Sequence, residues 1–345
     1  MKVAIRADAS TALGSGHVQR CLALASRLAV GGSSVTFYGR TAEGDLGDAI
    51  AARGFDRVRM PGDGTGWESD REFMGAALKV RGPWDWRVVD HYDLDARWET
   101  PLRAVVRRIL VVDDLADRPH DADVLLDQNE GDRVAAYAAR TPAACRRLLG
   151  PRFALLREEF GEWRRRIGPR AGPLRRLLVS FGGSDPTNET AKVLGALRDW
   201  PARSFSVDVV AGFNDGRTSA LARAAADLKN VRFLVRVDNM AERMSGADLA
   251  VGAAGGSTWE RGALFLPAIV AVVAPNQAPI AAAVAQRGAV VNLGDHARVA
   301  PADYRKAIEA LAASPERLAE MSRRAGELTD GEGAARVAAV MREGQ

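Results

Sequence analysis

The chain has 345 residues, of which 47% are hydrophobic and 27% charged, as in an ordinary globular protein that can bury a substantial core. The formal net charge is only +4, and basic and acidic residues are interspersed, so the sequence predicts no nucleic-acid partner. No run approaches the 18 or so uninterrupted apolar residues that a membrane span requires, so none is predicted.

Cysteine and histidine usage argues against disulfides and against a histidine-built metal site. The cysteines are Cys21 and Cys145, with no CxxC pair, and the start MKVAIRADAS lacks the apolar core of a signal peptide. We therefore expect a cytoplasmic protein with reduced thiols. None of the four histidines shares a metal-ligand spacing with another.

Two series of short apolar runs alternate with segments of helical period, which is typical of parallel sheets covered by helices. In the first half we expect strands at 3–7, 34–38, 87–90, 109–113 and 122–127. The pattern restarts with expected strands at 176–181, 206–211, 231–235, 249–253, 268–273 and 289–293. Because one core rarely supports a chain of this length, we predict an α/β protein with two Rossmann-like domains whose parallel sheets face across a cleft.

The expected domain divisions follow from these series. We predict an N-terminal domain at 1–150, a linker helix with a Gly/Pro/Arg-rich end at 151–173, a C-terminal domain at 174–300, and C-terminal helices at 301–345.

A glycine-rich turn followed by a histidine stands directly after the first expected strand. Gly14 and Gly16 in TALGSGHVQR allow a positive φ and a close approach of backbone to a ligand. His17 then falls in the first turn of a helix, where the helix dipole disfavours a positive charge, as a general base requires. The alternative is that His17 merely hydrogen-bonds a neighbouring loop.

Polar side chains also follow the later strands of this half. Asp90, His91 and Tyr92 end one expected strand, where they could serve a ligand or simply finish the sheet. Asp113 and Asp114 end the next strand, and we favour a structural role for them because adjacent residues of an extended chain point to opposite faces.

The second half carries two glycine-containing loops that precede helices and one amide-bearing loop. Backbone N–H groups around Gly183 and Ser184, and around Gly255, Gly256, Ser257 and Thr258, could bind phosphate, although neither loop is a Walker motif. Glu260 would reach ribose hydroxyls, and the alternative is a capping box with Ser257 as the cap. Asn276 and Gln277 could bind sugar hydroxyls or phosphate, or cap the following helix.

Taken together, RADASTALGSGHVQRCLALA, VVDHYDLD, VVDDLADRPHDADVLLDQN, GPRFALLREEF, SFGGSDPTNET and GAAGGSTWERGALFLPAIVAVVAPNQ resemble the PseG family. These are the UDP-2,4-diacetamido-2,4,6-trideoxy-β-L-altropyranose hydrolases of pseudaminic acid biosynthesis. The motifs occur in order over residues 1 to about 300. The chain departs from the pattern in its C-terminal extension and in Phe265, where a small residue is expected.

The resemblance implies the GT-B architecture, with UDP held mainly by the C-terminal domain and the sugar towards the N-terminal one. It implies that His17 is the catalytic histidine, Tyr92 an active-site tyrosine and Asn276 a sugar-side residue. The remaining candidate substrate contacts are Gly14, Gly16, Asp90, Gly183, Ser184, Gly255, Gly256, Ser257, Thr258, Glu260 and Gln277. The implied reaction takes a UDP-sugar and water and releases UDP, with no cofactor and no metal demanded. The alternatives are a GT-B glycosyltransferase and a non-catalytic UDP-sugar binding protein.

Overall fold

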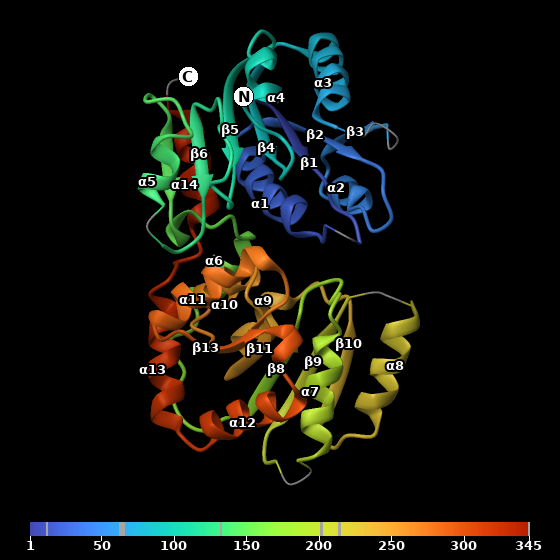
Figure 1. Cartoon of the computed structure of the whole chain (residues 1–345), viewed down its shortest axis with the longest axis vertical. Helices are drawn as coiled ribbons and strands as arrows, with labels where there is room; N and C mark the ends of the chain where they lie inside the picture. The colour runs from blue at the N-terminus through green and yellow to red at the C-terminus, as the bar shows by residue number, and fades with distance from the viewer. Residues whose placement is uncertain (12, 62–65, 132, 201–202, 213–214, 344–345) are drawn as a thin grey trace. The chain divides into compact units, whose positions relative to one another are not determined.

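A computed structural model describes residues 1–11, 13–61, 66–131, 133–200, 203–212 and 215–343 of the chain (Figure 1). It divides into two compact units, one of Met1–Arg157 with Glu332–Gln345 and the other of Glu158–Gly331. Each unit is an α/β domain built on a sheet whose paired strands are all parallel.

The first unit contains a seven-stranded sheet with the order β3-β2-β1-β4-β5-β6-β7. Its strands are β1 (Lys2–Ala7), β2 (Ser34–Arg40), β3 (Asp56–Met60), β4 (Trp84–Asp90), β5 (Val106–Val112), β6 (Val124–Asp127) and β7 (Arg146–Leu149). The strand order reverses between β1 and β4, where Ala7 is in register with Asp90. In open parallel sheets, ligands bind at the carboxyl ends of the strands beside such a reversal.

Helices cover both faces of this sheet. They are α1 (Gly16–Val30), α2 (Gly47–Ala52), α3 (Trp67–Arg81), α4 (Ala96–Leu102), α5 (Val134–Ala138) and α14 (Gly333–Arg342), with a 3₁₀ turn, η1, at Pro151–Phe153. The helix predicted from His17 onward is confirmed as α1, whose apolar side buries Val18, Cys21, Leu22, Leu24, Ala25 and Leu28. These residues pack in one core with Val3 and Ile5 of β1.

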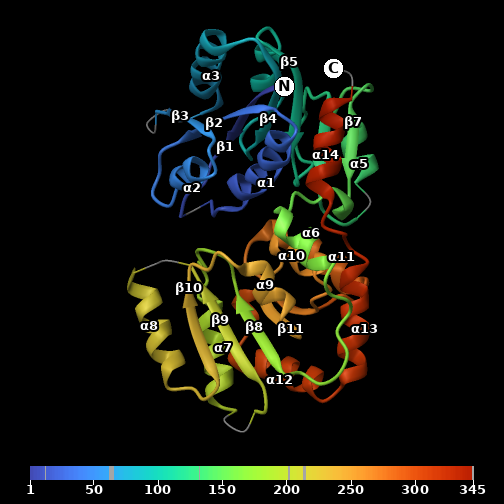
Figure 2. The ribbon, with the colours of Figure 1, turned by 180° about the vertical axis from the view of Figure 1, so that it is seen from behind.

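The last helix of the chain, α14, returns to the first unit and packs against α1 (Figure 2). The indole N–H of Trp86 donates to the Met341 carbonyl at 2.9 Å, and Arg342 donates to the Arg27 carbonyl at 3.0 Å. The segment 301–345, expected as one group of helices, is thus divided between the two units.

The second unit contains a six-stranded sheet with the order β10-β9-β8-β11-β12-β13. Its strands are β8 (Arg176–Ser180), β9 (Ser206–Ala211), β10 (Val231–Val235), β11 (Leu249–Ala253), β12 (Ala268–Val272) and β13 (Val290–Asp295). Here the strand order reverses between β8 and β11. The two glycine-containing loops singled out in the sequence follow these two strands.

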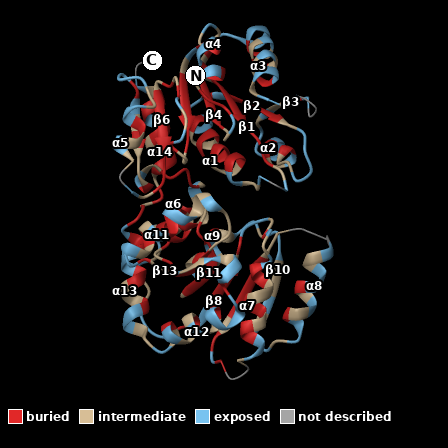
Figure 3. Cartoon of the chain, in the orientation of Figure 1, coloured by how far each residue is buried: buried red, intermediate tan, exposed pale blue. Residues whose placement is uncertain are grey.

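The helices of the second unit are α6 (Glu158–Arg164), α7 (Glu189–Arg198), α8 (Asp215–Ala226), α9 (Met240–Ser245), α10 (Ser257–Ala263), α11 (Ala278–Gln286), α12 (Pro301–Ala312) and α13 (Pro315–Gly326). Two 3₁₀ turns, η2 and η3, lie at Pro275–Gln277 and His296–Arg298. In both units the central strands are buried, whereas the outer faces of the helices are exposed (Figure 3).

Phe265, which departs from the expected small residue, has a φ of +54°. This left-handed conformation favours glycine and is strained for an aromatic residue. The ring lies against Gly326, where a Cβ atom would collide with it, and the Arg164 guanidinium lies 4.2 Å from the ring centroid. The missing side chain at Gly326 therefore provides the space that the Phe265 ring occupies.

All eleven predicted strands are confirmed, with ends that differ by a few residues, but β3 and β7 were not predicted. No helix within the described residues is long and apolar enough to cross a lipid bilayer.

Candidate active site

The candidate active site of the first unit lies where the strand order reverses, at the carboxyl ends of β1 and β4. The chain leaves β1, passes through a turn in which Gly14 has a φ of +78°, and enters α1 at Gly16. The Gly14 amide donates to the Ser10 carbonyl at 2.8 Å, which closes the turn. Gly16 has open space where a Cβ would stand, so this turn presents uncovered backbone next to His17.

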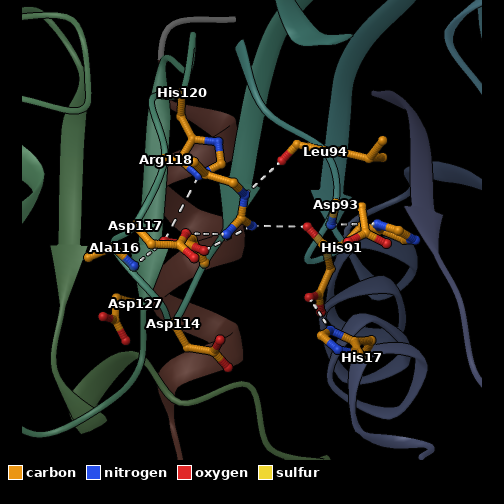
Figure 4. Close-up of polar contacts among 12 residues, drawn as sticks. His17, His91, Asp93, Leu94, Asp114, Ala116, Asp117, Arg118, His120 and Asp127 are labelled. Atoms are coloured by element: carbon orange, nitrogen blue, oxygen red, sulfur yellow. Dashed lines mark hydrogen bonds and ion pairs between the residues drawn. The ribbon is translucent and has the colours of Figure 1, made fainter. Parts of the chain in front are cut away.

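His17 is held by Asp90, the last residue of β4. Nδ1 of His17 lies 2.6 Å from Oδ1 of Asp90, and both side chains are buried (Figure 4). Because an ionised carboxylate only accepts hydrogen bonds, the proton of the neutral imidazole must sit on Nδ1. Nε2 then carries the lone pair, and it has no hydrogen-bond partner among the described residues. The geometry is that of a histidine prepared to accept a proton.

Asp90 is fully buried and has both oxygens occupied by protein donors. Arg20 donates through Nε to Oδ2 and through Nη2 to Oδ1, both at 2.6 Å, and the Cys21 thiol lies 3.6 Å from Oδ2. Burial opposes ionisation of Asp90, but the charge of Arg20 and the hydrogen bonds from Arg20 and His17 hold its pKa well below the ordinary range. Asp90, a candidate substrate contact in the sequence, lies against His17 and Arg20 in the structure.

Tyr92, two residues beyond β4, places its ring against His17. The two ring centroids are 4.6 Å apart, with an interplanar angle of 82°, an edge-to-face arrangement that aromatic rings favour. The structure therefore brings together three of the residues that the sequence singled out, namely His17, Asp90 and Tyr92.

His91 forms a second histidine–aspartate pair at the same edge of the sheet. Its Nε2 lies 3.3 Å from Oδ2 of Asp8. Its Nδ1 accepts the Asp93 amide at 3.1 Å (Figure 4). Asp8 is in turn paired with Arg6 at 2.6 Å and accepts the Arg40 amide at 2.8 Å. Both ring nitrogens of His91 have partners within the unit, so this side chain stabilises the loop after β4.

The other carboxylates at this edge serve mainly internal contacts. Asp113 accepts the Tyr137 hydroxyl and the Ala116 amide, each at 2.9 Å. Asp127 accepts Arg133 at 2.7 Å, and burial raises its pKa. Asp114 contacts a different partner, Arg20, at 3.3 Å. The adjacent pair Asp113 and Asp114 thus diverges, as the extended backbone predicts.

In the second unit, the loop after β8 holds Gly183 and Ser184. Asp185 accepts the backbone amides of Glu189 at 2.9 Å and of Thr190 at 3.0 Å. The carboxylate therefore occupies amides at the start of α7 that a phosphate would otherwise use. The Gly183 carbonyl also lies so close to Gly212 that a side chain there would collide with it.

The loop after β11 holds Gly255 to Thr258, and the N-cap of the helix that follows makes no side-chain cap hydrogen bond. Ser257 is the first residue of α10, and Gly256, not Ser257, is the N-cap, so the capping-box alternative is wrong. Buried Arg261 instead binds the loop, donating to the Ala253 carbonyl at 2.8 Å and to the hydroxyls of Ser257 and Thr258 at 3.1 Å. Burial lowers the pKa of Arg261 to about 10, so it still carries its charge at neutral pH.

Gln277 lies beside this loop. A Cβ at Gly255 would stand 3.4 Å from its amide nitrogen, and its amide oxygen accepts the Val273 amide at 3.2 Å. Asn276 lies next to it in η2, and Glu260 is half-buried in α10. Gln277 is the N-cap residue of α11, but its side chain makes no cap hydrogen bond. The structure thus brings Gln277 to the loop of Gly255, and Asn276 stands in the neighbouring turn.

Sequence reasoning did not single out Arg20 and Arg261. Arg20 stands one helical turn after His17, a spacing that puts both on one face of α1. Arg261 stands directly after Glu260, within the quoted motif. Among the described residues no group of three or more His, Cys, Asp or Glu side chains gathers in a way that could hold a metal ion.

Comparisons with known proteins identify similar sequences, although no family model matches the chain. An uncharacterized protein of Methanocaldococcus jannaschii is 27% identical over 286 residues, which cover 80% of this chain and 56% of that protein. The UDP-2,4-diacetamido-2,4,6-trideoxy-beta-L-altropyranose hydrolase of Campylobacter jejuni is 24% identical over 246 residues, which cover 71% of this chain and 82% of the hydrolase. The chain therefore spans only about half the length of the first of these relatives.

Solved structures match the chain along almost its whole length. MurG of Acinetobacter baumannii has a TM-score of 0.67 at 15% identity and covers 99% of both chains. The UDP-GlcNAc 2-epimerase of Neisseria meningitidis, solved bound to UDP-GlcNAc, has a TM-score of 0.62 at 10% identity and also covers 99% of both. With its two parallel-sheet units, the chain has the GT-B fold.

Proposed function

We propose that this protein hydrolyses a UDP-linked 2,4-diacetamido-2,4,6-trideoxy sugar to the free sugar and UDP. The observation that carries the proposal is the His17–Asp90 pair, in which Nδ1 is bound at 2.6 Å and Nε2 is left without a partner among the described residues. The hydrolase from Campylobacter jejuni, at 24% identity, supports the same reaction class.

In this proposal the two units supply different parts of the chemistry. The first unit supplies the base, His17, and Tyr92 beside it. The second unit holds UDP, with the phosphates at Gly255–Thr258 and the ribose at Glu260, while Asn276 and Gln277 contact the sugar end. The charge of Arg261 behind the loop favours a diphosphate there. Gly183 and Ser184 are the weaker phosphate candidates, because Asp185 already fills amides at the start of α7.

The proposed reaction is a single displacement at the anomeric carbon. Tyr92 orients a water molecule, and Nε2 of His17 removes its proton as the water oxygen forms a bond to the anomeric carbon. The bond between that carbon and the diphosphate oxygen breaks, UDP leaves with the bonding electrons, and the anomeric configuration inverts. Asp90 keeps the imidazole in the required tautomer and stabilises the imidazolium that forms.

The second candidate function is transfer of the sugar to an acceptor by a GT-B glycosyltransferase, since glycosyltransferases are among the solved structures that share this fold. The two reactions differ in what they need besides the donor. Incubation of the protein with UDP-diacetamido sugars alone, followed by NMR, separates them, because a hydrolase releases UDP and free sugar without an acceptor. Absence of UDP with every sugar of the panel would contradict hydrolysis, and UDP that appears only when an acceptor is added would favour transfer.

The assignment of the base is tested with His17→Leu. We expect turnover to fall by at least about 10²-fold, because a positioned general base contributes that much or more, while UDP affinity measured by calorimetry stays close to that of the unmodified protein. Turnover near the original rate would overturn the assignment. A protein that binds UDP-sugar yet never cleaves it would instead be a binding protein, the third alternative.

A further inference from the structure

Arg20 lies on the same face of α1 as His17, three residues further along the helix. Its side chain is 12% exposed, and its guanidinium reaches β4 and the loop after β5. This placement sets a fixed positive charge next to the residue that is proposed to accept the proton.

The guanidinium of Arg20 donates two hydrogen bonds to Asp90. Nε donates to Oδ2 and Nη2 donates to Oδ1, each at 2.6 Å, so the carboxylate plane is fixed relative to α1. Oδ1 is the same oxygen that accepts Nδ1 of His17, also at 2.6 Å. Arg20 therefore sets the position of the carboxylate oxygen that accepts the hydrogen bond from His17.

The charges around His17 decide how readily it becomes an imidazolium. A buried carboxylate by itself strongly favours a protonated histidine beside it, and such a histidine cannot act as a base. Arg20 opposes this in two ways: it pairs with the Asp90 charge, and its Nη2 lies 3.3 Å from Nδ1 of His17.

The other groups around His17 are few. On α1 the Cys21 thiol stays neutral at physiological pH, because burial raises its pKa well above the ordinary value. The loop after β4 presents the uncharged Tyr92 ring. Asp114, after β5, acts on Arg20 at 3.3 Å and offsets part of its charge. Asp90 and Arg20 thus contact His17 directly, and Asp114 acts on it through Arg20.

We infer that Arg20 is a positioning residue that holds Asp90 against His17 and balances the charge of Asp90, so that His17 can act as an uncharged proton acceptor. The inference deepens the proposed function and rests on it wherever turnover is the readout. The contacts themselves do not depend on which sugar is cleaved.

The experiment compares Arg20→Gln with Arg103→Gln. Arg103 is a matched control, since it also pairs with two carboxylates, Asp121 at 2.8 Å and Asp123 at 3.0 Å, but lies at the amino ends of β5 and β6. In Arg20→Gln we expect the acid limb of the kcat/KM profile for UDP release to move up by about one to two pH units. Arg103→Gln should leave that limb in place.

The imidazole of His17 is followed in parallel by NMR titration, with its resonances assigned from His17→Gln. In Arg20→Gln the midpoint of that titration should move to higher pH by the same amount, even if the unmodified protein releases no UDP. Failure of the proposed function and failure of this inference are therefore distinguishable. An unmoved midpoint in Arg20→Gln would overturn the role of Arg20.

Two further variants keep the inference testable if Arg20→Gln does not fold. Arg20→Lys keeps a positive charge but cannot donate two hydrogen bonds in the fixed geometry of a guanidinium. The midpoint of the His17 titration should therefore stay near that of the unmodified protein, while kcat falls. Asp114→Asn removes the carboxylate that offsets part of the Arg20 charge, so the midpoint of the His17 titration should move to lower pH. A midpoint that moved to higher pH in Asp114→Asn would contradict the proposed charge balance.

Discussion

Two histidine–aspartate pairs stand at the same edge of the first sheet, and they differ in what the second nitrogen of the ring does. His91 is bound at both nitrogens, to Asp8 and to the Asp93 amide, whereas His17 is bound only through Nδ1 within the described residues. A carboxylate beside a histidine is thus not enough to identify a base. An Nε2 without a hydrogen-bond partner in the described part of the chain is the feature that sets His17 apart.

The same substitution in both pairs tests most directly whether only the His17 pair takes part in the reaction. Asp90→Asn should lower the rate of UDP release by about 10² to 10⁴-fold, because an amide can no longer hold the Nδ1–H tautomer or stabilise the imidazolium. Asp8→Asn, the matched control, should keep turnover per folded molecule. Equal losses in the two variants, measured by NMR, would mean that the two pairs are functionally alike.

A smaller effect is expected at the ring that packs on His17. Tyr92→Phe keeps the edge-to-face contact, in which the centroids are 4.6 Å apart, but removes the hydroxyl. Loss of one hydrogen bond to water should lower kcat by about tenfold, and Tyr92→Leu should lower it further. Steady-state kinetics of both variants test this order, and an unchanged kcat in Tyr92→Phe would remove the hydroxyl from the mechanism.

His91→Gln should affect stability and not turnover. Removing both of its contacts leaves Asp8 and the Asp93 amide without these partners, at a cost of about 1–3 kcal/mol in the free energy of unfolding. Urea denaturation measures the cost, and UDP release at low denaturant measures the activity that remains. A large loss of kcat with unchanged stability would place His91 in the reaction.

Acid should weaken both pairs through their carboxylates. Burial opposes the ionisation of Asp8, but hydrogen bonds from His91 and Arg6 hold its pKa below the ordinary 3.8, and Asp90 behaves likewise through Arg20 and His17. A carboxylate with a depressed pKa in the folded state adds stability above its unfolded pKa, and this is lost as the pH falls below 3.8. Unfolding followed at neutral pH and at about pH 3 should therefore show a smaller acid loss in Asp8→Asn than in the unmodified protein.

The sequence predicted the architecture well because both sheets have apolar central strands. The two strands that were not predicted, β3 and β7, are the outer strands of the first sheet. Their sequences, DRVRM and RRLL, carry arginines, since an edge strand is covered less completely than a central one. The apolar pattern therefore finds the middle of the first sheet and misses its borders, whereas the edge strands of the second sheet, β10 and β13, are apolar enough to be predicted.

The candidate site was predicted less completely. His17 at the start of α1 and its neighbour Tyr92 follow from local patterns, but the role of Asp90 depends on a contact across 73 positions of sequence. Arg20 could have been found from its spacing to His17, whereas its partners could not. Asp185 and Ser184 are adjacent in sequence, and only the structure shows that Asp185 is the one that accepts amides at the start of α7.

The meeting of Phe265 with Gly326 has a consequence for variation at these two positions. The ring fits because position 326 has no Cβ, so the two residues constrain each other although they lie far apart in the chain. We expect covariation: where a relative carries a side chain at the position of Gly326, the position of Phe265 should hold a small residue. Non-additive stabilities of the single and double variants would report the same dependence within this chain.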